Sequence, residues 1–256
     1  FHELFNYQLK LQLQNINSRI EDIRYCVGVN SKDIDNFKNS LPFTLTGAQS
    51  RVIDEIIEDL NNPYKMDRLL QGDVGSGKTV VAAATLYATI KEGYQAAIMA
   101  PTEILANQHF ETFFEFFKDL NISVALLTSS TPKKERNTIL SLLEVGEIEL
   151  LIGTHSLIQE DVKFNNLKYV ITDEQHRFGV KQRQLLSNKG EAVNSLMMTA
   201  TPIPRSLAIT LITDIKVSTI DELPAGRKKV QTYKATNKSF YKVLDNIRME
   251  LDNGRQ

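Results

Sequence analysis

The stretch Gly72-Asp73-Val74-Gly75-Ser76-Gly77-Lys78-Thr79 fits the pattern G-x-x-x-x-G-K-[ST] at every fixed position. Residues 67–71, immediately before it, are short and apolar enough to form a buried strand, and residues 80–87 can continue as a helix. This order of strand, loop and helix is the context in which the pattern binds the phosphates of a nucleoside triphosphate. The stretch therefore predicts an α/β fold built around a phosphate-binding loop.

Each residue type in this loop has a physical reason to be there. Backbone N–H groups must come within hydrogen-bonding distance of a phosphate, and side chains at Gly72, Gly75 and Gly77 would obstruct that approach or the positive φ angles it needs. Lys78 supplies a mobile cation for the outer phosphates, and Thr79 supplies a hydroxyl for Mg²⁺. We expect all eight residues to bind ATP. The alternative is an ordinary glycine-rich turn that precedes a helix.

Length and composition are those of an ordinary globular protein. The 256 residues, 42% of them hydrophobic, suffice for one large α/β domain with appendages. A net charge of −1 excludes a strongly basic surface, so nucleic acid would be held by local features. The single cysteine, Cys26, cannot form an internal disulfide, and no span of 18 apolar residues occurs, which predicts a cytoplasmic location. Because the sequence begins at Phe1, we expect an excised piece of a longer chain.

Apolar strand-like runs alternate with amphipathic helical runs after the loop. The expected strands are Gln95–Ala100, Ile122–Thr128, Ile148–Ile152, Leu167–Asp173, Ser195–Thr199 and Ile215–Ile220. The expected helices are Glu103–Lys118, Pro132–Gly146, Val180–Ser187 and Arg205–Ile212, after a connecting helix in residues 1–25, a short helix at Ile34–Asn39 and another ending near Leu60. Such alternation predicts right-handed crossovers and a mostly parallel sheet with helices on both faces.

Gln49 has two competing interpretations. Thr46 and Gln49 show the T-x-x-Q spacing of a capping box at a helix start. A carboxamide can also donate to and accept from the N7 and N6 edge of adenine. The position of Gln49, about twenty residues before a phosphate-binding loop, favours adenine binding. Phe43 and Leu45 are expected to line the same adenine site.

Two adjacent carboxylates end the predicted strand that runs into Asp173-Glu174-Gln175-His176. In an open α/β sheet, ligands bind at the carboxyl ends of the strands. Asp173 can hold Mg²⁺, and Glu174 can orient and deprotonate the attacking water. We predict that these four residues are catalytic together with Lys78. The alternative is a helix cap or a solvated turn.

Hydroxyl groups follow a second predicted strand, in Thr199-Ala200-Thr201-Pro202-Ile203-Pro204-Arg205. This segment could be a turn that starts a helix with proline near its first position. We favour a coupling role, in which Thr199, Thr201 and Arg205 sense the γ-phosphate through Gln175 or His176 and act on bound nucleic acid.

Two further strand ends carry hydroxyl groups at helix starts. They are Ala100-Pro101-Thr102-Glu103 and Gly153-Thr154-His155-Ser156. Exposed N–H groups and hydroxyls can bind the phosphates of a nucleic acid backbone without a basic patch. We predict such contacts at Pro101, Thr102, Thr154 and His155. The alternative is helix capping by the same atoms.

Taken together, these motifs resemble those of superfamily 2 helicases. Their sequences are similar to those of the RecG family of bacterial ATP-dependent DNA helicases. The resemblance covers residues 43–256. Its most specific parts are residues 69–79, Asp173-Glu174-Gln175-His176-Arg177-Phe178-Gly179-Val180, residues 199–205 and Ile220-Asp221-Glu222-Leu223-Pro224-Ala225-Gly226-Arg227. Transcription-repair coupling translocases are similar, but they typically have phenylalanine where Ser76 stands, DEEH in place of DEQH, and no LPxGR stretch.

The RecG resemblance implies a three-part enzyme with a wedge domain and two RecA-like motor domains that bind ATP and Mg²⁺ between them. We expect residues 1–40 to be a helical linker from the wedge domain, 41–222 the first motor domain, and 223–256 a linker with the start of the second. The first strand of that second domain is expected near Val230–Ala235 and its first helix near Lys238–Asp252. The resemblance implies remodelling of branched DNA at stalled forks and Holliday junctions, with this chain nearly inactive alone. Alternatives are a duplex DNA translocase, a phosphate-loop kinase or transport ATPase, and a nucleotide-gated binding module without activity.

Overall fold

A computed structural model of the chain describes residues 22–173, 180–201, 215–222, 234, 236 and 239–254. The chain forms two compact units, Phe1–Pro224 and Ala225–Gln256. In the second unit the structure describes one long helix, α9 (Phe240–Asp252), close to the helix expected near residues 238–252. The other elements described below belong to the first unit.

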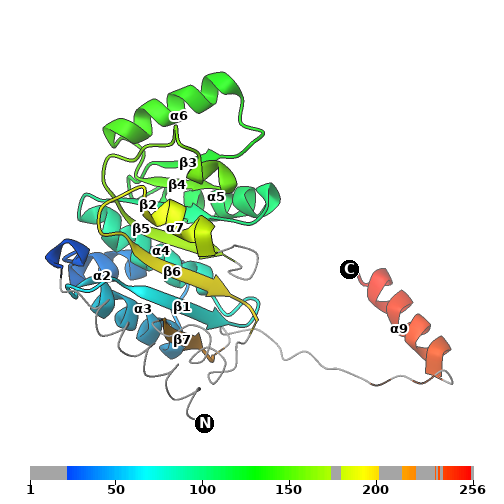
Figure 1. The fold of residues 1–256 in the computed structure, drawn as a ribbon. Helices are drawn as coiled ribbons and strands as arrows, with labels where there is room; N and C mark the ends of the chain where they lie inside the picture. Colours follow the sequence, from blue (N-terminus) through cyan, green and yellow to red (C-terminus); the bar gives the residue numbers. More distant parts are fainter. Residues whose placement is uncertain are drawn as a thin grey trace, which may run out of the picture. The chain divides into compact units, whose positions relative to one another are not determined.

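The first unit is built on a parallel sheet of seven strands. In chain order these are β1 (Asp67–Gly72), β2 (Gln95–Met99), β3 (Val124–Leu127), β4 (Leu150–Gly153), β5 (Leu167–Asp173), β6 (Asn194–Thr199) and β7 (Lys216–Ile220). Their order in the sheet is β3-β4-β2-β5-β6-β1-β7, and each neighbouring pair is parallel (Figure 1). The predicted α/β class with a parallel sheet is confirmed.

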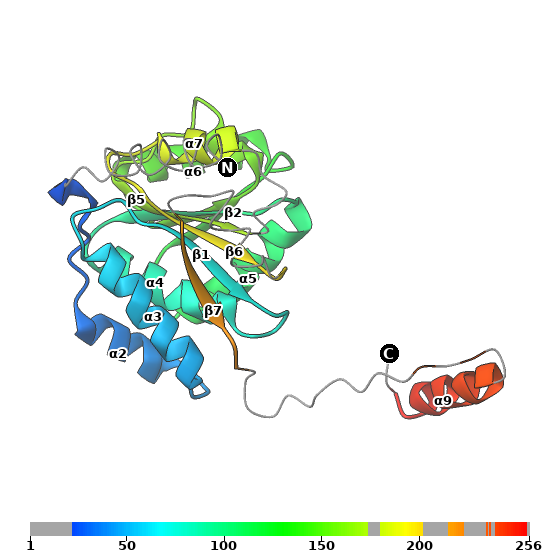
Figure 2. The same cartoon turned by 60° about the horizontal axis from the view of Figure 1, so that its bottom comes forward.

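Helices cover both faces of this sheet. They are η1 (Ile23–Tyr25), α2 (Ser31–Ser40), α3 (Gly47–Leu60), α4 (Lys78–Lys91), α5 (Glu103–Phe117), α6 (Lys133–Val145), η2 (His155–Ile158) and α7 (Val180–Ser187). Figure 2 shows α2 to α5 on one side of the sheet and α6 and α7 on the other. Every crossover between parallel strands needs such a connection, which explains why helical and strand patterns alternate in the sequence.

The two-residue period of the strands divides the apolar side chains between two cores. Tyr169 and Ile171 of β5 face the core beneath α4, whereas Val170 between them faces the core beneath α6. Both faces of a parallel sheet are covered, so its strands are apolar throughout. α4 lies deepest, and all residues from Val80 to Ile90 are buried. Its run of small residues suits a helix surrounded by protein.

α2 also belongs to this packed unit. Its Phe37 is fully buried and its ring centroid lies 5.6 Å from that of Tyr87 on α4 and 6.2 Å from that of Phe117 on α5. The boundary expected at residue 40 remains a prediction. The structure adds that the helix just before it contributes to the core of the first unit.

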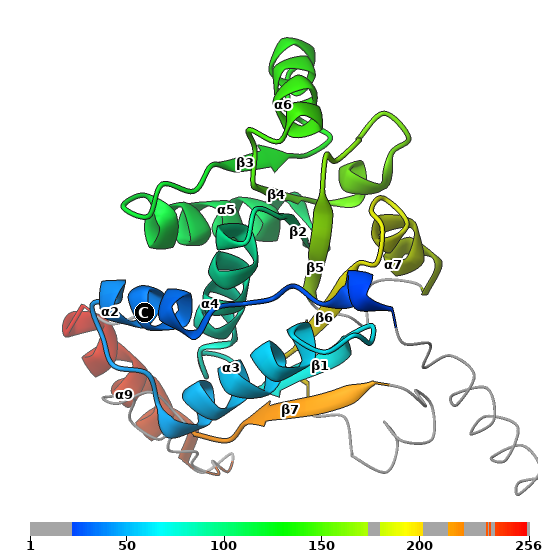
Figure 3. The same ribbon diagram turned by 90° about the vertical axis from the view of Figure 1, so that its left-hand side faces the viewer.

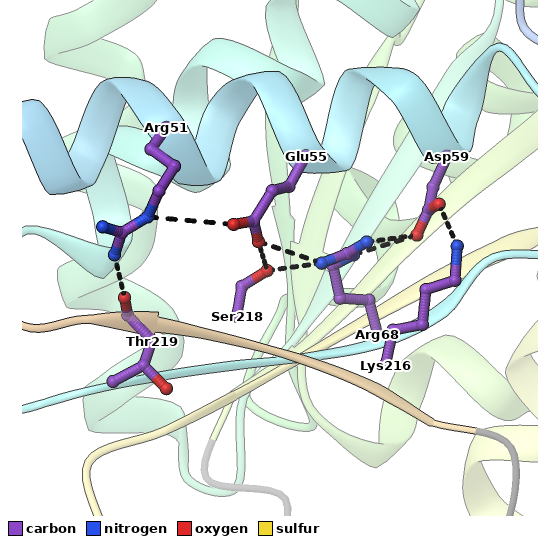
Figure 4. Close-up of polar contacts among 7 residues, drawn as sticks. All are labelled: Arg51, Glu55, Asp59, Arg68, Lys216, Ser218 and Thr219. Carbon is purple, nitrogen blue, oxygen red and sulfur yellow. Dashed lines mark hydrogen bonds and ion pairs between the residues drawn. The ribbon is translucent and has the colours of Figure 1, made fainter.

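Charged side chains join α3 to the strands beneath it. Arg68 of β1 donates to Asp59 Oδ2 from Nε at 3.0 Å and from Nη2 at 2.6 Å, and it also contacts Glu55 and Ser218 (Figure 4). Lys216 of β7 donates to the other oxygen of Asp59 at 2.5 Å. Figure 3 shows α3 lying along β1 and β7, so this cluster fixes the helix over these two strands.

Some predicted elements lie outside the described residues. They are the connecting helix over most of residues 1–25, the helix at 205–212 and most of the first strand of a second motor domain near 230–235. Within the described ranges, no helix is long and apolar enough to cross a bilayer.

Candidate nucleotide-binding site

The carboxyl ends of β1, β6 and β5 lie side by side at one edge of the sheet. Leu70 of β1 is opposite Met198 of β6, which is opposite Asp173 of β5. With strands about 4.8 Å apart, the Cα atoms of Leu70 and Asp173 are separated by roughly 10 Å. Thr199 is opposite Gln71. The phosphate-binding loop therefore begins on the same edge, close to Thr199 and Asp173.

Glycine is required at three positions of the loop by its geometry. Gly75 and Gly77 have φ angles of 74° and 91°, which favour glycine. A Cβ at Gly72 would lie 2.5 Å from Ser76 Oγ, and one at Gly77 would lie 2.2 Å from the side-chain nitrogen of Gln49. A side chain at Gly72 or Gly77 would thus collide with a neighbouring side chain, and the φ angles of Gly75 and Gly77 favour glycine, as the sequence pattern indicates.

The N-terminus of α4 has features that suit a phosphate group. Gly77 caps the helix in a left-handed conformation without a side-chain hydrogen bond, so the first N–H groups of the helix have no side-chain cap. Lys78 Nζ donates to the carbonyl oxygens of Gly72 at 2.7 Å and Asp73 at 3.1 Å, which places the cation over the loop. The half-buried Thr79 follows in the first turn. A helix N-terminus with a lysine beside it can bind an anion.

Gln49 links α3 to the phosphate-binding loop. Its Oε1 accepts from Thr46 N–H at 2.9 Å, and Thr46 Oγ1 accepts from Gln49 N–H at 3.2 Å, so the capping box is formed. Its Nε2 donates to the carbonyl oxygen of Ser76 at 2.9 Å. The capping interpretation, which the position of Gln49 had disfavoured, is therefore confirmed. Adenine binding by Gln49 remains a prediction.

The two other residues expected to bind adenine differ in exposure. Phe43 is 48% exposed, just before α3, and its ring is accessible for stacking. Leu45 is partly buried and packs against the core. Both lie within six residues of Gln49, at the end of α3 that contacts the loop.

Asp173 has a partner that the sequence did not reveal. Its Oδ2 lies 2.7 Å from Nε2 of His109 on α5, and both side chains are nearly buried. The other predicted catalytic residues that follow it, Glu174, Gln175 and His176, lie outside the described residues. The sequence does mark His109 as unusual, because it is a polar residue on the apolar face of a predicted helix. It lies three residues after Ala106 and four before Phe113.

Two of the three residues predicted to have a coupling role form a compact turn. Thr199 and Thr201 share a hydrogen bond between their hydroxyl oxygens at 2.9 Å, and Thr201 N–H donates to Thr199 Oγ1 at 3.2 Å. Arg205 lies outside the described residues. The turn places both hydroxyls at the end of β6, between the ends of β1 and β5.

The predicted nucleic acid contacts lie on the same edge of the sheet, at the ends of β2 and β4. Thr102 caps α5 by accepting from Leu105 N–H at 3.3 Å, as the capping alternative predicts. Pro101 precedes it and is half-buried. Thr154 is 7% exposed and makes no side-chain cap for η2, whereas the neighbouring His155 is exposed. Two of the four residues, Thr102 and His155, are thus accessible.

Sequence reasoning also missed a contact at the N-terminus of α3. Glu222, just beyond β7, accepts from Ala48 N–H through Oε2 at 3.0 Å. Arg51 donates to Asp221 Oδ1 at 2.9 Å and to Thr219 O at 3.0 Å. A carboxylate near the first turn of a helix is stabilised by the helix dipole. The segment that leaves β7 is therefore fastened to the helix that carries Gln49.

A phosphate-binding loop at the carboxyl edge of a parallel sheet defines the fold and site of a P-loop NTPase. Residues 46–209 match the family described as DEAD/DEAH box helicase, and the chain belongs to this family.

Curated relatives extend the similarity over the whole chain. The chain is 51% identical over 256 residues to the ATP-dependent DNA helicase RecG of Bacillus subtilis (strain 168), and 51% identical to that of Staphylococcus aureus (strain NCTC 8325 / PS 47). All of this chain is covered, against 38% and 37% of those proteins. The expected resemblance to RecG is confirmed, and the chain spans less than two fifths of the length of these relatives.

Solved helicase structures share the fold of this chain. A structure of RecG bound to a three-way DNA junction superposes with a TM-score of 0.85 at 44% identity, covering 99% of this chain and 34% of that one. The DUF1998 helicase MrfA, bound to DNA and AMPPNP, has a TM-score of 0.63 at 16% identity, covering 87% of this chain and 34% of that one. The second likeness shows the fold alone. The predicted RecA-like fold of a helicase motor domain is thus confirmed.

Proposed function

We propose that this chain is the first motor domain of a RecG-type DNA helicase, which couples ATP hydrolysis to the remodelling of branched DNA. The observation that carries the proposal is the register of β1, β6 and β5, which gathers the phosphate-binding loop, Thr199 and Asp173 at one edge. Similarity to RecG over the whole chain supports it. In this proposal residues 41–222 are the motor domain, with 1–40 and 223–256 leading to a wedge domain and a second motor domain.

The proposed roles follow the chemistry of each group. N–H groups of residues 72–79 and the Lys78 cation bind the phosphates, with Thr79 and Asp173 holding Mg²⁺. Mg²⁺, when bound, neutralises charge on the phosphate oxygens. Glu174 orients the attacking water and takes its proton. ATP binding is the general expectation for the family, and the roles of these residues are our proposal.

Coupling to DNA uses the neighbouring strand ends. We assign Thr199, Thr201 and Arg205 to sensing the γ-phosphate through Gln175 or His176. The exposed hydroxyl of Thr102 and the exposed His155, with Pro101 and Thr154 beside them, would contact the DNA backbone. All described members of this set lie on the edge that carries the phosphate-binding loop.

Activity is tested with the full-length protein. ATPase rates are measured with no DNA, single strands, duplex and a three-way junction, for the wild type and for Lys78→Ala. The proposal expects the largest stimulation by the junction and a loss of ATPase in the variant. Stimulation by plain duplex equal to that by the junction would favour a duplex translocase instead. Junction binding without ATPase would indicate a nucleotide-gated binding module.

A second measurement uses this chain alone. An arginine supplied by a partner domain contributes on the order of 10³–10⁵ in rate in phosphoryl transfer. The chain by itself should therefore bind ATP but hydrolyse it very slowly. Strong DNA-stimulated ATPase from the chain alone would contradict a need for the second motor domain.

A further inference from the structure

His109 and Asp173 form a contact between elements that are far apart in the sequence. His109 Nε2 lies 2.7 Å from Asp173 Oδ2, and the two side chains are 12% and 13% exposed. An ionised carboxylate only accepts hydrogen bonds, so beside an ionised Asp173 the imidazole is the donor, in the tautomer that carries its proton on Nε2. The contact joins α5 to the last residue of β5.

The direction of the imidazole is set by the packing of α5. Ala106, three residues before His109, and Phe113, four residues after it, are both fully buried. The rings of His109 and Phe113 lie with centroids 6.1 Å apart. Residues three and four apart share one helix face, so His109 is a polar side chain in a stripe of alanine and phenylalanine. The packing of α5 therefore turns His109 toward the protein interior, on the same face as Ala106 and Phe113.

The hydrogen bond constrains the metal-binding carboxylate. The side chain of Asp173 can rotate about its Cβ–Cγ bond, and the terminal torsion of such a side chain is broad. Holding Oδ2 at a fixed donor also sets the direction of Oδ1. Groups that hydrogen-bond to metal ligands orient them, and their loss typically costs about 10–100-fold in metal affinity or activity.

We propose that His109 is a positioning residue that orients Asp173 toward Mg²⁺ and ATP. The inference rests on the proposed function, in which Asp173 holds the metal, and extends it to α5. A core histidine that merely satisfies its hydrogen bond would leave the Mg²⁺ dependence of nucleotide binding unchanged when replaced.

The test compares two amide replacements in the full-length protein. In His109→Gln the amide nitrogen can reach the place of Nε2, whereas in His109→Asn it reaches only the place of Nδ1. The two variants are matched in polarity, and melting temperatures establish that each is folded. His109→Phe, which suits the surrounding stripe, serves as a third variant if an amide proves destabilising.

Two readouts are used. ATP affinity is measured by fluorescence of a labelled ATP with Mg²⁺ and with EDTA, and kcat and KM for ATPase are measured against Mg²⁺ concentration. We expect His109→Asn and His109→Phe to need about tenfold more Mg²⁺ for half-maximal binding and to lose about 10–100-fold in kcat. Their affinity for ATP in EDTA should be unchanged. His109→Gln should stay within about threefold of the wild type, by the same reasoning about the retained donor.

Three results would contradict the proposal or its basis. Equal Mg²⁺ dependence in folded His109→Asn and His109→Gln, whether high or low, overturns the positioning role. If both amide variants fail to fold, a folded His109→Phe with wild-type Mg²⁺ dependence overturns it as well. Absence of Mg²⁺-dependent ATP binding in the wild type would instead refute the proposed function on which the inference rests.

Discussion

The side-chain amide of Gln49 donates to the carbonyl oxygen of Ser76 at 2.9 Å, which ties the start of α3 to the phosphate-binding loop. The same carboxamide closes the capping box with Thr46. One side chain therefore stabilises a helix and restrains the loop that we propose binds ATP. Its replacement should affect stability and nucleotide binding to different degrees.

Gln49→Ala should weaken ATP binding about tenfold, the equivalent of one hydrogen bond, and destabilise the chain by about 1 kcal/mol through the lost cap. Gln49→Glu is the matched control. Glutamate at this position still accepts from Thr46 N–H, but a carboxylate cannot donate to Ser76. The Glu variant should therefore keep the capping box and lose affinity. Because Gln49 is 3% exposed, its carboxylate beside the Ser76 carbonyl should also lower the unfolding free energy.

Inorganic tripolyphosphate, which has no base, separates the two roles of Gln49. A role in the loop predicts that both variants weaken binding of tripolyphosphate as well as ATP. Isothermal titration calorimetry measures both. Unchanged tripolyphosphate binding with weakened ATP binding would instead assign Gln49 to adenine alone.

Gly77→Ala should abolish nucleotide binding. The new Cβ would sit 2.2 Å from the amide nitrogen of Gln49, and the φ angle of 91° strains any residue other than glycine. Gly93→Ala is the control, because Gly93 has a φ of 82° and nothing within 4 Å of its Cβ position. Both variants should lose about 1–3 kcal/mol of unfolding free energy from strain, but only Gly77→Ala should lose ATP binding. Normal ATP binding by Gly77→Ala would contradict the loop geometry.

Arg68→Met should destabilise the chain by about 3–5 kcal/mol in urea unfolding, because it leaves the nearly buried Asp59 without its main partner. In the double variant with Asp59→Leu, most of the loss should be recovered, since a buried ion pair can be replaced by apolar groups. A loss below about 1 kcal/mol in Arg68→Met would mean that Lys216 alone suffices for Asp59.

Acid unfolding should report the ion pair between Arg136 and Asp161. The hydrogen bonds from Arg136 lower the pKa of Asp161 from its usual 3.8. A lowered folded-state pKa means that the unfolded chain binds more protons, so the contribution is present above pH 3.8 and is lost as the pH falls through the lower folded value. The difference in unfolding free energy between wild type and Arg136→Met should therefore be constant near neutral pH. It should shrink as the pH falls from 3.8 through the lower folded-state pKa of Asp161. A difference independent of pH would exclude the pairing.

The periodic parts of the chain could be predicted from the sequence. β5 and α7 have the bounds expected from their residue patterns, and β2 and α5 differ from expectation by one residue at the end. Alternation of apolar residues is a local signal, so it needs no knowledge of distant contacts. The strand order across the sheet, with β7 beside β1, has no such local signal.

Polar contacts between residues far apart in the sequence could not be predicted, because they also have no local signal. The sequence shows Arg68 in the strand before the phosphate-binding loop, but it does not show its partners, Asp59 and Ser218, of which Ser218 is 150 residues away. His109 meets Asp173 across 64 residues. The capping box of Thr46 and Gln49 does have a local signal, the T-x-x-Q spacing, whereas the hydrogen bond from Gln49 to Ser76 has none.

The most direct test is a crystal structure of the full-length protein with Mg²⁺ and a non-hydrolysable ATP analogue. We expect triphosphate density against the N–H groups of residues 72–79, Lys78 Nζ on the outer phosphates, and Mg²⁺ between Thr79 and Asp173. Nucleotide bound away from this edge, or a metal that neither Thr79 nor Asp173 approaches, would contradict the proposed site.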